Sequence, residues 1–163
     1  MIKLMLKITM LSSVFISLST LASDGFYFKY LNEKIVAYSD KINFCDDTKV
    51  TPVFSIVELA SLKEIVSKKA PVLSYFSIKS YNECLQPERS ELAELLLSYN
   101  YVDVSLYTKK LVISTGKLIF IRDFEGLQLY KTLNNKDKNF IDSIGGFKKP
   151  FNELEVFEII MGM

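Results

Sequence analysis

Residues 101–133 read YVDVSLYTKKLVISTGKLIFIRDFEGLQLYKTL, and this stretch decides the predicted fold. Apolar and polar residues alternate along much of it, and a period of two is typical of strands with one buried face. Gly116 and Gly126 stand where tight turns between such strands are needed, because glycine adopts positive φ without a steric cost. We therefore predict a four-stranded antiparallel meander over residues 101–133.

Two earlier stretches also favour β-structure. Residues 25–38, GFYFKYLNEKIVAY, contain two runs of aromatic and β-branched residues on either side of Asn32 and Glu33. This pattern predicts an N-terminal β-hairpin with a two-residue turn. Residues 72–79, which follow Pro71, are predicted to form a further strand.

Helices are predicted between and after these strands. Ser55 and Glu58 form a capping-box pattern, and the apolar residues that follow at spacings of three and four predict a helix over residues 56–68. Pro87 suits the first turn of a second helix. Residues 152–161 are compatible with a helix or a strand. The predicted fold is thus α+β, with the hairpin and meander packed against two or three helices.

The N-terminus has the features of a secretory signal peptide. Lys3 and Lys7 precede an uncharged apolar run over residues 8–22, and Ala22 offers a small residue for cleavage. The alternative is an uncleaved anchor helix, but the run is shorter than the roughly 20 residues that cross a bilayer. We predict a signal peptide over residues 1–22, a single exported domain over residues 23–163, and no stable membrane insertion after cleavage. The expected location is the periplasm or the cell exterior.

The two cysteines are predicted to form one disulfide. Cys45 and Cys84 are the only thiols, and an even pair in an exported chain is most simply a bridge. On the chain-entropy description, a loop of this length contributes about 4 kcal/mol. A catalytic thiol is the alternative, but the chain has neither a histidine nor a CxxC motif to activate it.

Composition excludes several classes of protein. The 163-residue chain has no histidine, so it forms no Ser-His-Asp triad and no histidine-bearing zinc site. Without residues 1–22 it carries 18 basic and 19 acidic residues, which argues against a nucleic-acid partner. We predict no metal site, no cofactor and no catalytic residue.

Two kinds of residue are candidates for contact with a protein partner. The aromatic residues of the predicted hairpin either form an exposed tyrosine platform or are buried on both sides, and tyrosine is enriched at protein interfaces. The acidic residues could meet a basic cleft on the partner, although a helix face of glutamates is also an ordinary solvated surface. The candidate residues are Tyr27, Tyr30, Tyr38, Asp46, Asp47, Glu88, Glu91 and Glu94.

These observations lead to three hypotheses for the function. The first is a non-catalytic periplasmic binding protein, an inhibitor or immunity protein that blocks a toxin or a cell-wall hydrolase. The second is a small carboxylate-dependent hydrolase of the envelope, for which Asp46, Asp47, Asp103 and Asp123 could supply a pair. The third is a secreted structural or adhesive subunit. The Ser-x-x-Lys pattern at Ser114 is not expected to act as a nucleophile motif, since that motif needs its serine at the start of a helix.

Overall fold

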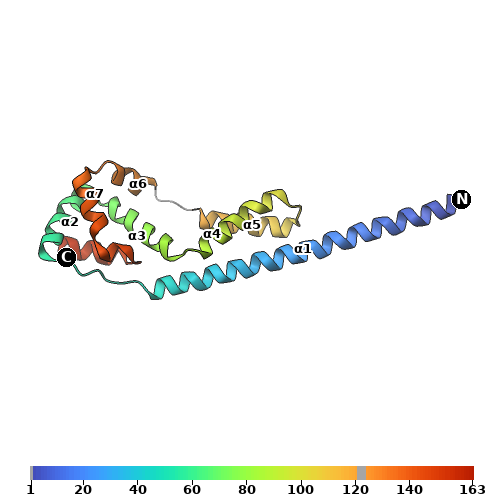
Figure 1. Cartoon of the computed structure of the whole chain (residues 1–163), viewed down its shortest axis with the longest axis horizontal. Coiled ribbons are helices and arrows are strands. Elements are labelled where there is room, and N and C mark those ends of the chain that lie inside the picture. Colours follow the sequence, from blue (N-terminus) through green and yellow to red (C-terminus); the bar gives the residue numbers. More distant parts are fainter. Residues whose placement is uncertain (1, 121–123) are drawn as a thin grey trace. The chain divides into compact units, whose positions relative to one another are not determined.

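The computed structural model describes the backbone of residues 2–120 and 124–163, and the side chains of residues 24–120 and 124–163. Over these residues the chain is helical, with no β-strand (Figure 1). The predicted α+β fold is therefore wrong. The helices are α1 (Ile2–Asp47), α2 (Ile56–Lys68), α3 (Pro71–Cys84), α4 (Glu88–Ser98), α5 (Leu106–Ile119), α6 (Phe124–Lys131), α7 (Asn135–Ser143) and α8 (Glu153–Met161), with short 3₁₀ helices η1 (Tyr99–Tyr101) and η2 (Gly145–Lys148).

The described residues form two compact units. The first unit contains residues 2–37 and 90–120, and the second contains residues 38–89 and 124–163. The predicted signal peptide, residues 1–22, falls outside the described side chains.

The predicted hairpin over residues 25–38 is part of α1. Leu31 is fully buried, and Tyr27 lies four residues before it on the same side of the helix. The aromatic residues had favoured strands, but β-propensity depends strongly on context and packing decides between the two forms. The pair Asn32-Glu33 continues the helix and makes no turn.

The predicted meander is replaced by α5 and α6, which are separated by residues outside the described part of the chain. The buried side of α5 includes Thr108, Thr115 and Ile119, at spacings of seven and four. Because two of these are threonines, the helical period does not show in the hydrophobic pattern. Gly116 and Gly126, predicted to form turns, lie inside α5 and α6.

The predicted strand over residues 72–79 is part of α3. Pro71 stands in the first turn of this helix, where its missing N–H has no intrahelical partner to lose. The buried residues Val72, Phe76 and Ser80 follow one another at spacings of four, which is the period of a helix.

The other helix predictions are confirmed. Ser55 Oγ accepts a hydrogen bond from the Glu58 N–H (3.2 Å), and the Ser55 N–H donates to Glu58 Oε2 (2.7 Å), so the capping box begins α2 as expected. Hydrogen bonds from Ser55 lower the pKa of Glu58, and the one from the Ser55 backbone N–H has the larger effect. The helix predicted after Pro87 is α4. Residues 152–161, whose sequence is compatible with a helix or a strand, include helix α8, which Asn152 caps.

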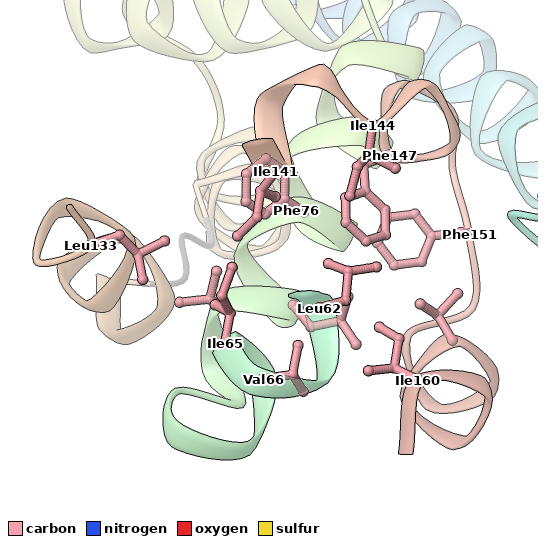
Figure 2. Close-up of a cluster of buried hydrophobic side chains, with 13 residues drawn as sticks. Leu62, Ile65, Val66, Phe76, Leu133, Ile141, Ile144, Phe147, Phe151 and Ile160 are labelled. Atoms are coloured by element: carbon pink, nitrogen blue, oxygen red, sulfur yellow. The ribbon is translucent and has the colours of Figure 1, made fainter. Parts of the chain in front are cut away.

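The second unit has a continuous hydrophobic core (Figure 2). The Phe76 ring stacks on Phe147, with 5.6 Å between centroids, and Phe147 packs against Phe151 at 5.1 Å. Aliphatic side chains from α2, α3, α7 and α8 complete this core. Its buried members are Leu62, Ile65, Val66, Val72, Leu73, Phe76, Leu133, Ile141, Ile144, Phe147, Phe151, Val156 and Ile160.

The segment between α1 and α2 lies tightly against the rest of the second unit. A Cβ atom added to Gly146 would stand 2.6 Å from Pro52 Cβ. The Val50 N–H donates to the Pro150 carbonyl at 2.9 Å. Only glycine at position 146 permits this approach without displacement.

In the first unit, α5 begins at a cap built from two parts of the chain. Ser105 Oγ accepts a hydrogen bond from the Thr108 N–H at 3.2 Å. Asp24 Oδ1 accepts from the Ser105 N–H (2.9 Å) and from Thr108 Oγ1 (3.2 Å). The backbone hydrogen bond from Ser105 is the main cause of the lowered pKa of Asp24. The cap therefore fixes which side of α5 faces α1.

No helix within the described part of the chain combines the length and the hydropathy that a membrane span requires.

Candidate protein-binding surface

A shallow groove of about 460 Å³ lies between α1 and α4 in the first unit. Its volume falls within the range of about 300–1,000 Å³ that is usual for ligand sites. The groove brings together three residues predicted to contact a partner, namely Tyr30, Glu91 and Glu94. It is lined by Tyr30, Lys34, Glu91, Glu94, Leu95 and Ser98.

Lys34 and Glu91 form an ion pair in this groove. Lys34 Nζ donates to Glu91 Oε2 at 2.7 Å, and it lies 5.8 Å from the centre of the Tyr30 ring. The hydrogen bond to Glu91 is the main cause of the raised pKa of Lys34, so the ammonium stays charged at neutral pH. The pair neutralises Glu91 and holds Lys34 beside the Tyr30 ring.

Glu94 supplies the remaining charge of the groove. It stands three residues after Glu91, on the same side of α4, and is exposed. Among the described residues it makes no ion pair or hydrogen bond. The lining side chains thus carry one positive and two negative charges. The net charge of −1 lies on Glu94, which can attract a cationic group.

Phe26 extends the aromatic surface beside Tyr30. The two rings stack with 6.2 Å between centroids and 3° between planes. Phe26 is 65% exposed and Tyr30 is 40% exposed. These rings offer a rigid apolar area next to the groove.

The other two candidate tyrosines are half-buried and make contacts within the protein. The Tyr27 ring meets Tyr99 edge-on at 6.1 Å, and the Tyr27 carbonyl accepts a hydrogen bond from the Tyr99 hydroxyl. In the second unit, Tyr38 is half-buried and hydrogen-bonded to Arg89, and burial raises its pKa. An exposed platform of three tyrosines therefore does not form on the described surface.

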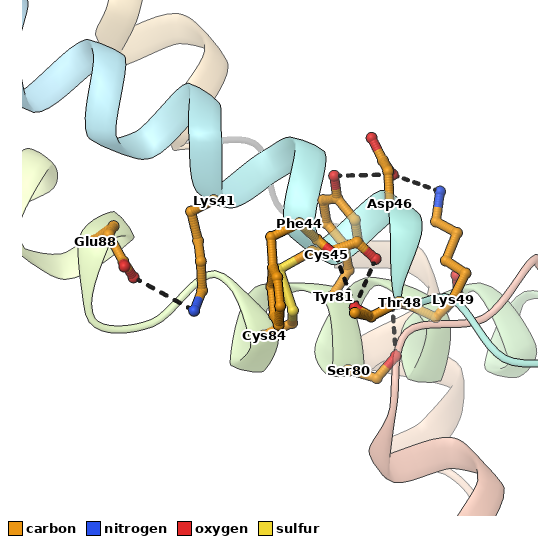
Figure 3. The surroundings of a disulfide bond; sticks show 11 residues. Lys41, Phe44, Cys45, Asp46, Thr48, Lys49, Ser80, Tyr81, Cys84 and Glu88 are labelled. Carbon is orange, nitrogen blue, oxygen red and sulfur yellow. Dashed lines mark hydrogen bonds and ion pairs between the residues drawn. A yellow bond between two sulfur atoms is a disulfide. The ribbon is translucent and has the colours of Figure 1, made fainter.

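The predicted disulfide between Cys45 and Cys84 is present, with 6.0 Å between the Cα atoms (Figure 3). It links α1 to the last residue of α3 inside the second unit. Next to it, Asp46 Oδ1 accepts hydrogen bonds from Lys49 Nζ (2.7 Å) and from the Tyr81 hydroxyl (3.2 Å). Burial and Asp46 together raise the pKa of Tyr81 to about 12, and Lys49 lowers that of Asp46.

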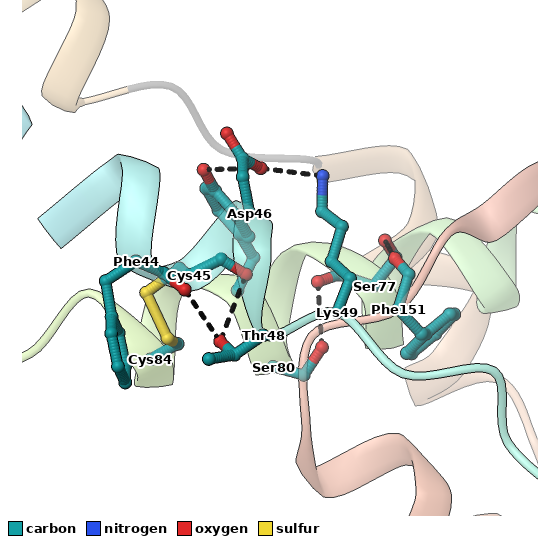
Figure 4. A network of polar contacts seen from close by, with 10 residues as sticks. Phe44, Cys45, Asp46, Thr48, Lys49, Ser77, Ser80, Cys84 and Phe151 are labelled. Carbon is teal, nitrogen blue, oxygen red and sulfur yellow. Dashed lines mark hydrogen bonds and ion pairs between the residues drawn. A yellow bond between two sulfur atoms is a disulfide. The ribbon is translucent and has the colours of Figure 1, made fainter.

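A second set of hydrogen bonds continues along α3 from the disulfide (Figure 4). Thr48 Oγ1 donates to the Phe44 carbonyl at 2.9 Å, which closes the end of α1. Ser80 Oγ donates to the Ser77 carbonyl (3.0 Å), and Ser77 Oγ donates to the Phe151 carbonyl (3.5 Å). These hydrogen bonds lie within the second unit and contribute to its stability.

The remaining acidic candidates differ in whether another side chain of the protein pairs with their carboxylate. Asp46 is held by Lys49 and Tyr81, as described, whereas Asp47 is exposed. Glu88 Oε2 lies 3.9 Å from Lys41 Nζ, an ion pair without a hydrogen bond. Glu91 and Glu94 line one groove together with the predicted residue Tyr30.

The other residues considered for catalysis are Ser114, Asp103 and Asp123. Ser114 is in the middle of α5, and its hydroxyl donates to the Leu111 carbonyl at 2.9 Å, so it lacks the helix-start position that a nucleophile motif needs. Asp103 pairs with Lys109 at 3.1 Å, and Asp123 lies outside the described residues. Over the residues with described side chains, no three potential metal ligands come together.

Sequence reasoning missed Lys34 and Phe26 as parts of this surface. Both stand four residues from Tyr30, one on each side, which is the spacing of neighbours on a helix. In the predicted hairpin these residues would not be neighbours, because side chains four residues apart are adjacent only on a helix.

No protein-family model, curated protein or solved structure matches this chain.

Proposed function

We propose that this protein is an exported, non-catalytic binding protein that blocks a toxin or a cell-wall hydrolase of the bacterial envelope. The observation that carries the proposal is the groove lined by Tyr30, Glu91 and Glu94, with the exposed Phe26 beside it. A partner would place a lysine or arginine side chain against Glu94 and an apolar side chain against the aromatic pair.

The chemistry of the groove supports a protein partner. Tyrosine and phenylalanine are enriched at interfaces because they offer large rigid areas at a small cost in side-chain entropy. Phe26 and Tyr30 are held against each other, which reduces that cost further.

The charge of the groove supports a basic partner. Enzymes and toxins that act on anionic polymers commonly carry basic clefts, because positive surfaces concentrate such substrates. Glu94 is exposed and has no ion pair within the described chain, so its attraction to a cation is not offset by a local lysine. Binding through this exposed charge should weaken as ionic strength rises.

The disulfide supports export. Structural disulfides persist mainly in oxidising compartments such as the periplasm and the cell exterior. The bridge between Cys45 and Cys84 and the signal-like N-terminus therefore favour the same location.

The test is capture and inhibition with matched variants. The purified chain is used to capture proteins from an envelope extract, and a captured toxin or hydrolase is then titrated calorimetrically against the wild type. Tyr30→Ser and Glu94→Lys should each weaken binding about tenfold or more, as loss of a central contact does. Glu158→Lys, an exposed reversal on α8, should leave affinity unchanged.

A partner bound one-to-one, whose activity falls in proportion to occupancy, would support the proposal. Asp47→Lys tests the other predicted acidic surface. If Asp47→Lys abolishes binding while Glu94→Lys does not, the groove is the wrong surface. Retention of no partner at micromolar concentration, or turnover of a substrate by the chain itself, would refute the function.

A further inference from the structure

Helix α5 buries Thr108, Thr115 and Ile119, but it exposes several of its large apolar side chains. Leu106 and Ile113 are 70% and 60% exposed, whereas Thr108 is fully buried and Thr115 is 9% exposed. A helix that served only the core of its unit would show the opposite orientation.

This orientation is held by specific contacts. Thr108 is tied to Asp24 (3.2 Å) and to Ser105 (3.1 Å), and the Tyr107 ring packs on Phe28 with 5.4 Å between centroids. Rotating α5 to bury its aliphatic residues would break these contacts. The exposed face is thus a built feature of the first unit.

Lysines lie among the exposed apolar residues. Leu106, Lys110, Ile113 and Lys117 follow at spacings of four, three and four and form one stripe, which we call the α5 stripe. The helix has three lysines and no acidic residue over Leu106–Ile119. Lys109 pairs with Asp103, while Lys110 and Lys117 have no partner among the described residues.

We propose that the α5 stripe binds the surface of an anionic phospholipid bilayer. Leu106 and Ile113 would enter the boundary between headgroups and acyl chains, while the lysines extend their ammonium groups to the lipid phosphates. This is binding at the surface of the bilayer and needs no membrane span.

The charge of α5 favours an anionic bilayer over a second copy of the chain or another protein. A second copy of α5 facing the first would oppose lysine to lysine, which disfavours self-association. Lysine is depleted at the centres of protein interfaces, whereas it is favoured on helices that lie on anionic membranes. The complete absence of acidic residues from α5 also suits a negatively charged surface.

The test is co-sedimentation of the whole chain with lipid vesicles. One set of vesicles contains phosphatidylglycerol and phosphatidylcholine in equal amounts, and the other contains phosphatidylcholine alone. Since every variant shares residues 1–22, differences between variants report on the α5 stripe. Thermal unfolding of each variant checks that it is folded.

Two variants of the α5 stripe, each compared with a control variant in the second unit, test whether the stripe binds the vesicles. The double variant Lys110→Glu/Lys117→Glu should lose about fivefold in partitioning for each lysine removed, whereas Lys148→Glu/Lys149→Glu in the second unit should not. Ile113→Ser should weaken binding about tenfold, whereas Ile56→Ser, at an isoleucine 87% exposed on α2, should have no effect.

Preference for the anionic vesicles together with selective loss in the α5 variants would support the proposal. Equal binding to both vesicles, or equal loss in the α5 and control variants, would overturn it. A dimer in sedimentation velocity that Ile113→Ser dissociates would also overturn it, in favour of a second copy as the occupant. Tyr30→Ser should leave vesicle binding intact, which separates this inference from the proposed function.

Discussion

The two units divide their apolar side chains in opposite ways. Among the described residues, the second unit buries fifteen hydrophobic side chains and exposes seven large ones, while the first buries six and exposes ten. The second unit also contains the disulfide and the continuous core. The comparison indicates that the second unit has the larger core, and it agrees with the two proposals that place binding surfaces on the first unit.

The largest expected effect comes from the core of the second unit. Phe76→Ala removes a ring that contacts Phe147 and Tyr130, and it should lower the free energy of unfolding by about 3–5 kcal/mol. Tyr101→Ala in the first unit, at a side chain 90% exposed, should change it by less than about 0.5 kcal/mol. Urea unfolding measures both. Similar losses would mean that the contrast between the units does not hold.

Removal of the disulfide should have the next largest effect. The double variant Cys45→Ser/Cys84→Ser frees the chain between the two residues in the unfolded state and should reduce stability by about 2–4 kcal/mol. Hydrogen exchange should show the loss of protection first in α2, α3 and α8 of the second unit. An unchanged melting temperature would show that the bridge is incidental to stability.

A smaller effect is expected at the start of α5. Ser105→Ala removes the side chain that accepts from the Thr108 N–H and should reduce stability by about 1 kcal/mol. Ser114→Ala is the matched control, because Ser114 is exposed in the middle of the same helix. A loss at Ser114 as large as that at Ser105 would contradict the assigned start of the helix.

The smallest effect concerns alkaline pH and the second unit. The pKa of Tyr81 is raised from 10.0 to about 12, so the folded protein holds this proton more tightly than the unfolded chain does. The corresponding stability is present below pH 10 and is lost as the pH rises from 10 to 12. Tyr81→Phe should therefore make the alkaline decline in urea midpoint shallower, while Tyr101→Phe should not. Equal slopes for wild type and Tyr81→Phe would refute the shift.

Local signals in the sequence predicted part of this fold. The capping box at Ser55 and Glu58 acts within four residues, so it identified α2 correctly. The cysteine pair predicted the disulfide from its number and from the signal-like N-terminus alone. In both cases the residues that determine the feature are recognisable by type and spacing.

Long-range contacts determined the parts that could not be predicted. The cap of α5 includes Asp24, which is 81 residues from Ser105 along the chain. The aromatic residues of α1 are helical because Leu31 and Tyr27 pack within the first unit, which their β-propensity does not reveal. For the same reason Tyr30, Glu91 and Glu94 were proposed as separate candidates, and only the helical form of α1 brings them to one groove.

The close approach of Gly146 to Pro52 determines where a fusion partner or affinity tag can be attached. An insertion between residues 48 and 54 would have to push Pro52 away from η2 and break the hydrogen bond between Val50 and Pro150. Met163 is 77% exposed, so a tag attached beside it displaces no buried side chain of the second unit.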